Sequence, residues 1–287
     1  MSDPAVQFAL LACPLVGSAR RDVLAFVKTL PAPWRKHGHE VITSTRLTSS
    51  RTLLVVCFHH DRGIVGQCWV SLPDVTFLGR IKPYSVIQHV NVQPHLRRRG
   101  IACDLITLAV GVSSRAGCAG VVAACGNSQL KNHLYAPLGF RPHPVDPWLL
   151  IRSCTGSAVH SDEPSSSIDM VRSASAHDVA TVQSLCVQKH WRRQGAKWWL
   201  VDGQEYEEDF CCHGVGDRHH TSRLLVRSNA LGHPCCGFVE SEGDTWSVRF
   251  VAGATSSASA QRFNAVCNKH MDALFASGHC CADAPLL

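Results

Sequence analysis

The segment that decides the fold is VNVQPHLRRRGIA, residues 90–102, which joins a predicted strand to a predicted helix. Residues 86–92 have strand character, and residues 101–116 carry apolar side chains at helical spacing. The turn between them contains Arg97-x-x-Gly100-x-Ala102. A helix N-terminus presents unpaired N–H groups and a partial positive charge, and Gly100 and Ala102 leave that backbone open, so the turn is typical of a phosphate site. The alternative is a plain basic turn on the surface.

The surrounding elements predict an α/β fold of the α+β type, with a mixed sheet flanked by helices. The predicted elements are strands at residues 8–13, 52–58, 64–72, 121–125 and 148–151, and helices at residues 18–30 and 130–137. Pro31 and Pro33 are expected to close the first helix. The short polar link at residues 59–63 favours an antiparallel hairpin, and the wholly apolar strand at 121–125 suits a buried parallel position. We therefore expect a mostly antiparallel sheet.

Three motifs in this order resemble the GCN5-related N-acetyltransferase (GNAT) superfamily, whose pattern is a strand, then Q/R-x-x-G-x-G/A, then a helix. Here Pro94 stands at the family's frequent V-x-P step, and Ala102 fills the last position of the motif. Downstream, Asn127 and LYAPLGF, residues 134–140, are similar to the family's N…LYxxLGF segment. Upstream, IVG, residues 64–66, is similar to its usual strand opening. The resemblance covers about residues 41–151.

The resemblance implies that the chain binds acetyl-coenzyme A. Backbone amides of residues 98–102 would hold the pyrophosphate, and the strand at residues 90–92 would pair with the pantetheine arm where the fourth and fifth strands separate. Asn127 would lie near the thiol end. The residues implied in coenzyme binding are Val90, Asn91, Val92, Arg97, Arg98, Arg99, Gly100, Ile101, Ala102 and Asn127.

The resemblance also implies that Tyr135 donates a proton to the leaving thiolate, and core packing is the alternative role for this side chain. Many members of the superfamily place a glutamate on the fourth strand to deprotonate the amine through water. Here that strand reads Ile87-Gln88-His89-Val90 and holds no carboxylate. His89 is the candidate base because imidazole titrates near neutral pH. A lone histidine on a strand is commonly structural, and a chain of waters is the alternative.

The chain beyond residue 153 predicts a linker and a second, smaller unit. Residues 1–153 form the predicted acetyl-CoA-binding domain, residues 154–167 a Ser-rich linker, and residues 168–287 a degenerate, truncated GNAT-like copy in a tandem repeat. The predicted elements of this copy are a helix at 175–190, strands at 223–226, 236–240 and 246–251, and a final helix at 261–275. Its equivalent turn, AGATSS at residues 252–257, lacks the arginine and the glycine spacing. This half is expected to complete the acceptor pocket or to buttress the first domain.

Composition narrows the classes of partner. The net charge of +6 suits an anionic small ligand at least as well as a nucleic acid, and without any nucleic-acid motif no such partner is predicted. No run is long and apolar enough for a membrane span, so no membrane partner is expected. Fifteen cysteines without a recognisable secretory signal favour reduced thiols and a cytoplasmic location. The Cys and His clusters lack zinc-ligand spacing, so no metal is expected.

The predicted function is transfer of an acetyl group from acetyl-CoA to a primary amine. A small-molecule acceptor is preferred to a protein lysine or N-terminus. The rival hypothesis is a catalytically inactive coenzyme-binding or scaffolding module. The missing strand carboxylate favours this rival, and Tyr135 together with the turn at residues 97–102 opposes it.

Overall fold

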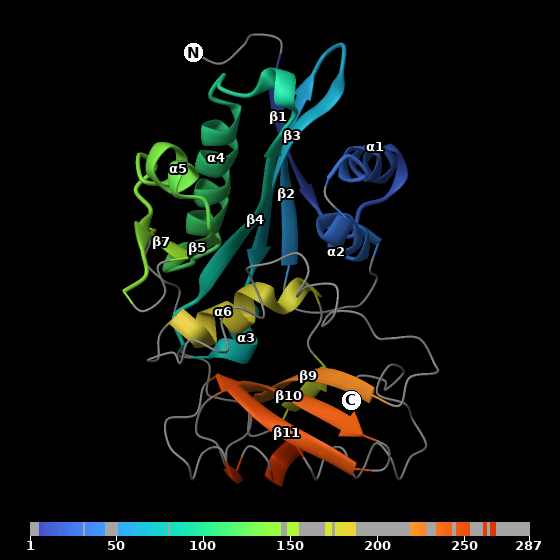
Figure 1. Cartoon of the computed structure of the whole chain (residues 1–287), viewed down its shortest axis with the longest axis vertical. Coiled ribbons are helices and arrows are strands. Elements are labelled where there is room, and N and C mark those ends of the chain that lie inside the picture. The colour runs from blue at the N-terminus through green and yellow to red at the C-terminus, as the bar shows by residue number, and fades with distance from the viewer. Residues whose placement is uncertain are drawn as a thin grey trace.

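The fold is a mixed sheet with helices on both faces, followed by a second, smaller sheet (Figure 1). The computed structural model describes residues 6–30, 32–43, 51–79, 81–144, 148–154, 170–173, 176–187, 219–227, 234–242, 245–252, 261–262 and 265–267. No helix among these residues has the length and hydropathy that a membrane crossing requires.

The first sheet has seven strands in the order β1-β2-β3-β4-β5-β7-β6. The strands are β1 (Val6–Ala12), β2 (Arg51–His59), β3 (Gly63–Leu72), β4 (Tyr84–Val92), β5 (Gly120–Ala124), β6 (Arg141–Pro142) and β7 (Leu149–Ser153). β4 and β5 pair in parallel, and every other neighbouring pair is antiparallel. The prediction of a mixed, mostly antiparallel sheet with a β2–β3 hairpin is confirmed.

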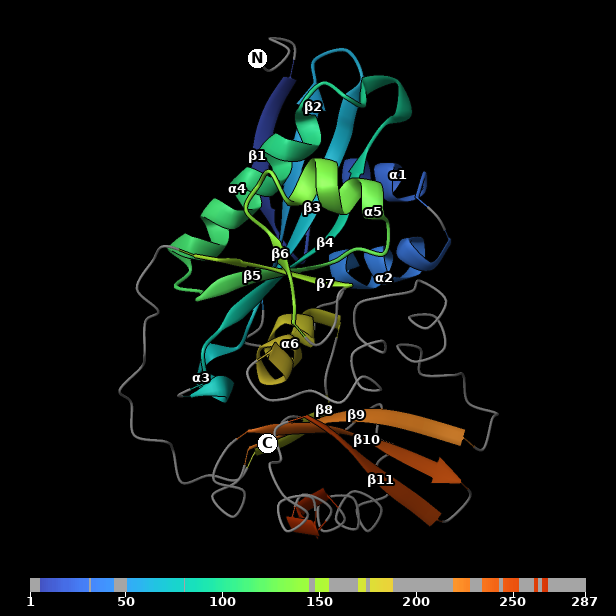
Figure 2. The same cartoon turned by 60° about the vertical axis from the view of Figure 1, so that its left-hand side comes forward.

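Helices cover the two faces of this sheet and enclose a separate apolar core on each (Figures 1 and 2). α1 (Gly17–Val27) and α2 (Ala32–Thr43) lie on one face; α4 (Ile101–Arg115), α5 (Ser128–Leu130) and the π-helical turn Lys131–Tyr135 lie on the other. Fully buried side chains of the α1–α2 core include Val23, Ile42, Leu54, Val56 and Trp69. Those of the α4 core include Cys57, Val65, Leu105, Ile106 and Val121. Burial of such side chains contributes about 1.5–3 kcal/mol each.

The helices α2 and α3 were not predicted from the sequence. Pro31 and Pro33 were expected to end helical structure, but Pro33 is the second residue of α2. The N–H groups of a helix's first turn have no acceptor within the helix, so a proline there removes no helical hydrogen bond. α3 (Val75–Leu78) is a single turn, which is too short to show a periodic pattern. Asp74 caps it by accepting a hydrogen bond from the Phe77 N–H at 2.9 Å.

The second sheet has four antiparallel strands in the order β11-β10-β9-β8. The elements are β8 (Met170–Ser173), α6 (Val179–Val187), β9 (His219–Arg227), β10 (Cys235–Glu242) and β11 (Thr245–Ala252). β9, β10, β11 and α6 were predicted, and β8 was not. A strand, a helix and three further antiparallel strands follow one another here as they do in the first sheet, but a tandem repeat stays a prediction. Most of the predicted linker, most of the AGATSS turn and most of the final helix lie outside the described residues.

α6 lies between the two sheets and packs on the first one (Figure 1). Thr181 Oγ1 accepts a hydrogen bond from the Asp74 N–H at 2.8 Å, and Ser184 Oγ accepts one from the Tyr84 N–H at 2.8 Å. His177 Nδ1 and Thr52 Oγ1 are 3.1 Å apart. Burial lowers the pKa of His177. Although α6 belongs to the predicted second domain, these buried contacts fasten it to the β3–α3–β4 segment.

Candidate functional site

β4 separates from β5 halfway along its length. The parallel pairing ends at Ile87 with Ala123, whereas β4 continues to Val92 and stays paired with β3 up to Gly66. In the described part of the chain, no strand pairs with residues 88–92 on the β5 side. The main-chain groups on that side can therefore pair with an extended ligand, as an added strand would.

A β-bulge accompanies the separation. Between the pairs Trp69–Gln88 and Gln67–Asn91, β4 supplies two residues, His89 and Val90, against one residue of β3. His89 takes a left-handed backbone conformation with φ of 50°. A bulge bends its strand and increases the local twist, which turns the end of β4 away from β5.

His89 is enclosed by aromatic rings on the α1–α2 face of the sheet. Its ring centroid lies 5.3 Å from that of Trp34 and 4.6 Å from that of Trp69, both in edge contact. The residue as a whole is half-buried, but its Nδ1 is enclosed. Burial lowers the pKa of His89 from 6.5 to about 3. The imidazole is thus neutral at pH 7 and a weak proton acceptor, so these surroundings oppose the predicted role as base, and that role stays a prediction.

The pKa of His89 predicts a pH-dependent stability. Between pH 6.5 and about pH 3, His89 is protonated in the unfolded chain and neutral in the folded chain. The free energy of unfolding should therefore fall by about 1.4 kcal/mol per pH unit in this window, with no contribution from His89 above it. His89→Asn, which tolerates the positive φ, should remove that slope in urea unfolding across the window. His95→Asn, at an exposed position, is the control. Equal slopes in the native chain and His89→Asn would contradict the assignment.

The turn from β4 into α4 is open at the helix N-terminus. A 3₁₀ turn, Pro94–Leu96, leads to Arg98 with φ of 63° and to Gly100, the N-cap of α4, with φ of 84°. As the N-cap, Gly100 offers no side chain to cap this end of α4. A Cβ built on Gly100 would meet no atom within 4 Å, so glycine serves the backbone conformation and leaves open space above it. Left-handed residues in such a turn aim N–H groups into a concavity that suits an anion.

The three arginines of the turn differ in role. Arg97 Nε donates to the Val92 carbonyl at 3.0 Å and so fastens the turn to the end of β4. Arg98 and Arg99 are exposed at the rim. Ile101 is buried in the α4 core, so only its backbone could reach a ligand. The sequence motif placed all of them against the coenzyme and gave no sign of the brace that Arg97 forms.

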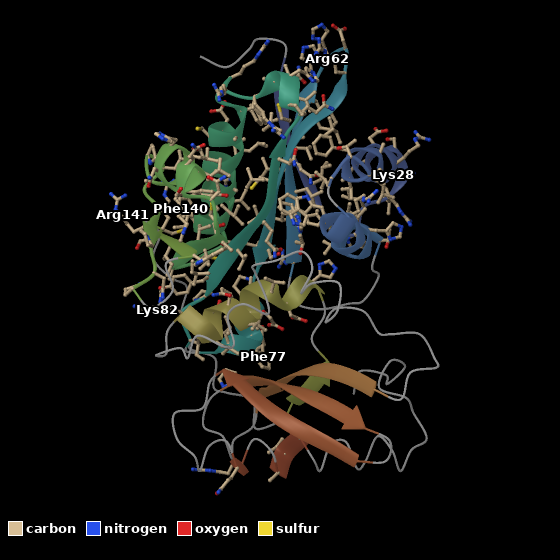
Figure 3. The ribbon with its side chains drawn as sticks, in the orientation of Figure 1. Lys28, Arg62, Phe77, Lys82, Phe140 and Arg141 are labelled. Carbon is tan, nitrogen blue, oxygen red and sulfur yellow. The ribbon has the colours of Figure 1, made fainter. Side chains whose placement is uncertain are left out.

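Tyr135 lies beside the separation of β4 and β5. Its pKa is raised by burial and by two thiols, those of Cys68, opposite the bulge, and Cys125, after β5. The ring packs edge-on against Phe140, which Figure 3 labels, at 5.4 Å between centroids. Among the described residues its hydroxyl has no hydrogen-bond partner. The phenol is therefore packed in the core and protonated, with a donor to offer to a ligand.

Asn127 has a structural task in this site. Its side-chain oxygen accepts from the Leu130 N–H at 3.1 Å and caps α5, which leaves only its amide NH₂ for a ligand. The motif placed Asn127 near the thiol end, and contact with the coenzyme stays a prediction. The helix-cap preference of asparagine was the signal for the second role.

The hairpin between β2 and β3 carries a polar cluster of His59, which is half-buried, and the exposed residues His60 and Asp61. Their ligand atoms lie within 4.8 Å of one another. His60 Nε2 and Asp61 Oδ2 are 2.9 Å apart, and His59 Nδ1 accepts from the Asp61 N–H at 3.2 Å. These contacts join the three residues to one another at the hairpin turn.

No protein-family model and no curated protein matches the sequence. Among solved structures, the chain is similar to an Escherichia coli GNAT family N-acetyltransferase in complex with CoA, at 16% identity and a TM-score of 0.39 over 53% of this chain and 84% of that one. It is also similar to Arabidopsis thaliana NAA60 in complex with a bisubstrate analogue, at 19% identity and a TM-score of 0.38. This alignment covers 53% of this chain and 99% of that one. A GCN5-related N-acetyltransferase from Kribbella flavida aligns at 15% identity and a TM-score of 0.36. This alignment covers 91% of this chain and 60% of that one. The Escherichia coli and Kribbella flavida proteins carry the name of the superfamily that the motifs resemble.

Proposed function

We propose that the chain transfers an acetyl group from acetyl-CoA to a primary amine. One observation carries the proposal: the stretch of β4 at residues 88–92, from which β5 has separated, is joined by the short turn at residues 93–100 to the open N-terminus of α4. An extended amide-bearing arm would pair with the edge of β4, and a pyrophosphate would bind at the N-terminus of α4. The motif resemblance at residues 90–140 supports the same ligand.

In this proposal the thioester would lie at the bulge. The amine nitrogen attacks the thioester carbonyl carbon, the C–N bond forms, and the C–S bond then breaks. The Tyr135 hydroxyl, which burial keeps protonated, donates its proton to the leaving thiolate. The proton lost by the amine passes to water, because His89 is a weak base in its aromatic enclosure. A small-molecule amine is the preferred acceptor, and a protein lysine or N-terminus is the alternative.

A coenzyme-binding module without turnover is the second candidate. β4 carries Gln88 in place of a carboxylate, and this observation favours an inactive site. Both candidates bind CoA, so binding alone cannot separate them.

Thiol release from acetyl-CoA separates the two. The full chain is incubated with acetyl-CoA and a panel of amines that includes polyamines, amino sugars and short peptides with free lysine or N-terminal amines. Release that depends on one acceptor class and saturates with it supports transfer. CoA binding without amine-dependent release across the panel would select the inactive module.

A further inference from the structure

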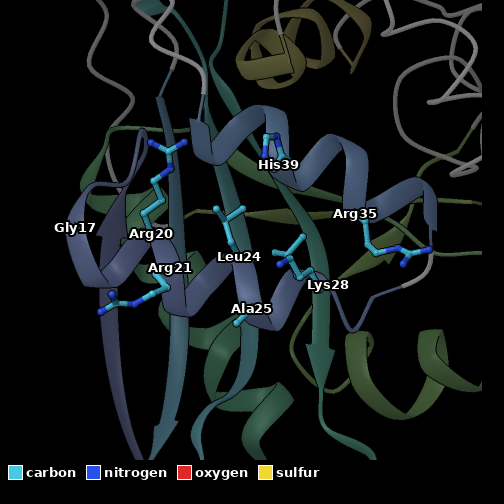
Figure 4. Close-up of a pocket in the computed structure, with 9 residues that line it drawn as sticks. Gly17, Arg20, Arg21, Leu24, Ala25, Lys28, Arg35 and His39 are labelled. Atoms are coloured by element: carbon cyan, nitrogen blue, oxygen red, sulfur yellow. The ribbon is translucent and has the colours of Figure 1, made fainter.

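A pocket of about 560 Å³ lies between α1 and α2, and its rim is basic. Its lining includes Arg20, Arg21, Leu24, Lys28, Arg35 and His39. Figure 4 shows Arg20 and Arg21 toward one end and Arg35 toward the other, with Leu24 between them. The volume is in the range of small-molecule sites, which is about 300–1,000 Å³.

Helical spacing builds this pocket from both helices. Arg21 and Leu24 on α1 and its C-cap residue Lys28 lie on one face, because they are spaced three and four residues apart. Arg35 and His39 are four residues apart on α2 and form the facing ridge. The side chains of Ala25 and Val27 add to the apolar floor that Leu24 provides. The pocket therefore combines an apolar floor with cations on two sides.

Two of these cations lie where the helix dipole disfavours positive charge. Arg20 is the fourth residue of α1 and Arg35 the fourth residue of α2, near the ends where a helix dipole repels positive charge. Neither first turn contains an acidic residue. Among the described residues, none of Arg20, Arg21, Lys28 and Arg35 pairs with a carboxylate. Four exposed cations around one pocket favour an anion as its ligand.

We infer that the α1–α2 pocket binds an organic phosphate, a phosphate ester on an apolar body. The guanidinium groups and the Lys28 ammonium would bind the phosphate oxygens, since the planar guanidinium group of arginine matches phosphate geometry. The apolar body would pack on the floor around Leu24. The pocket lies on the opposite face of the sheet from α4, so it is separate from the turn at Gly100 (Figure 1). The inference therefore stands whether or not the chain transfers acetyl groups.

Phenyl phosphate is the probe, titrated into the full chain and followed by calorimetry and by the melting temperature. We expect saturable binding that weakens when the ionic strength is raised to about 1 M, where charges are screened beyond about 3 Å. Inorganic phosphate and benzyl alcohol should each bind at least about tenfold more weakly, because each lacks one half of the recognition. No saturable binding at low salt, or equal binding of either half-ligand, would overturn the inference.

Variants locate the site. The double variant Arg21→Glu with Lys28→Glu, and separately Arg35→Glu on the other helix, should each weaken phenyl phosphate binding by at least about tenfold. Arg62→Glu makes the same charge change on the β2–β3 hairpin, away from the pocket (Figure 3), and should leave the affinity unchanged. A Gly100→Asn variant should also bind the probe normally. Loss of binding in Gly100→Asn, with retention in the pocket variants, would place the phosphate at α4 and overturn the inference.

Discussion

Replacing Gly100 with asparagine is expected to remove CoA binding and leave the chain folded. Asparagine tolerates the left-handed conformation that Gly100 holds at φ of 84°, and a Cβ there meets no protein atom within 4 Å. Its side chain would instead fill the space above the α4 N-terminus, where a pyrophosphate would approach the backbone. The affinity measured by calorimetry should fall at least about a hundredfold, which corresponds to about 2.7 kcal/mol.

Gly63→Asn is the matched control for this variant. Gly63 also has a positive φ, 68°, and its Cβ would also meet no atom within 4 Å, but it lies in the β2–β3 hairpin. Both variants should lower the melting temperature by a similar small amount, and only Gly100→Asn should lose CoA. Equal CoA affinity in the two variants would mean that the turn at residues 97–102 does not hold the coenzyme.

Tyr135→Phe is expected to slow acetyl transfer by about a hundredfold and to leave the KM for acetyl-CoA unchanged. General acid catalysis contributes about 10²–10⁴ to a rate, and the variant removes only the hydroxyl that would protonate the thiolate. Phenylalanine keeps the edge contact with Phe140, so the core should remain intact. Steady-state kinetics with the best acceptor of the amine panel measure the effect.

Tyr84→Phe provides the corresponding control. Tyr84 is half-buried at the start of β4, in the stretch that is still paired with β5, and therefore lies away from the separation. Loss of its hydroxyl should not alter kcat. Unchanged turnover in Tyr135→Phe would remove that residue from the chemistry and leave it a packing role alone.

The sequence was sufficient to predict the segment from β4 to α4, because a strand pattern, a glycine and a helical pattern stand next to one another there. It could not predict the bulge at His89 and Val90, since a bulge is a mismatch between two strands and leaves no mark on either one. The sequence also could not predict that Trp34 and Trp69 enclose His89. Those rings come from α2 and β3, and only the assembled sheet brings them to the imidazole.

The interface of α6 shows a second limit of sequence patterns. Thr181, Gln183 and Ser184 are polar, and an amphipathic helix would turn such residues to solvent, yet all three are fully buried. Thr181 and Ser184 can be buried because their hydroxyl oxygens accept hydrogen bonds from the backbone N–H groups of Asp74 and Tyr84. Partners about a hundred residues away in the chain cannot be inferred from the helix alone.

The most direct test of the coenzyme site is a calorimetric titration of the native full chain with CoA. The geometry of β4, the turn and α4 predicts saturable binding of one CoA per chain, with a pronounced loss of affinity as salt screens the phosphates. The absence of binding at any accessible CoA concentration would contradict the assignment of this site, and with it the proposed acetyl transfer.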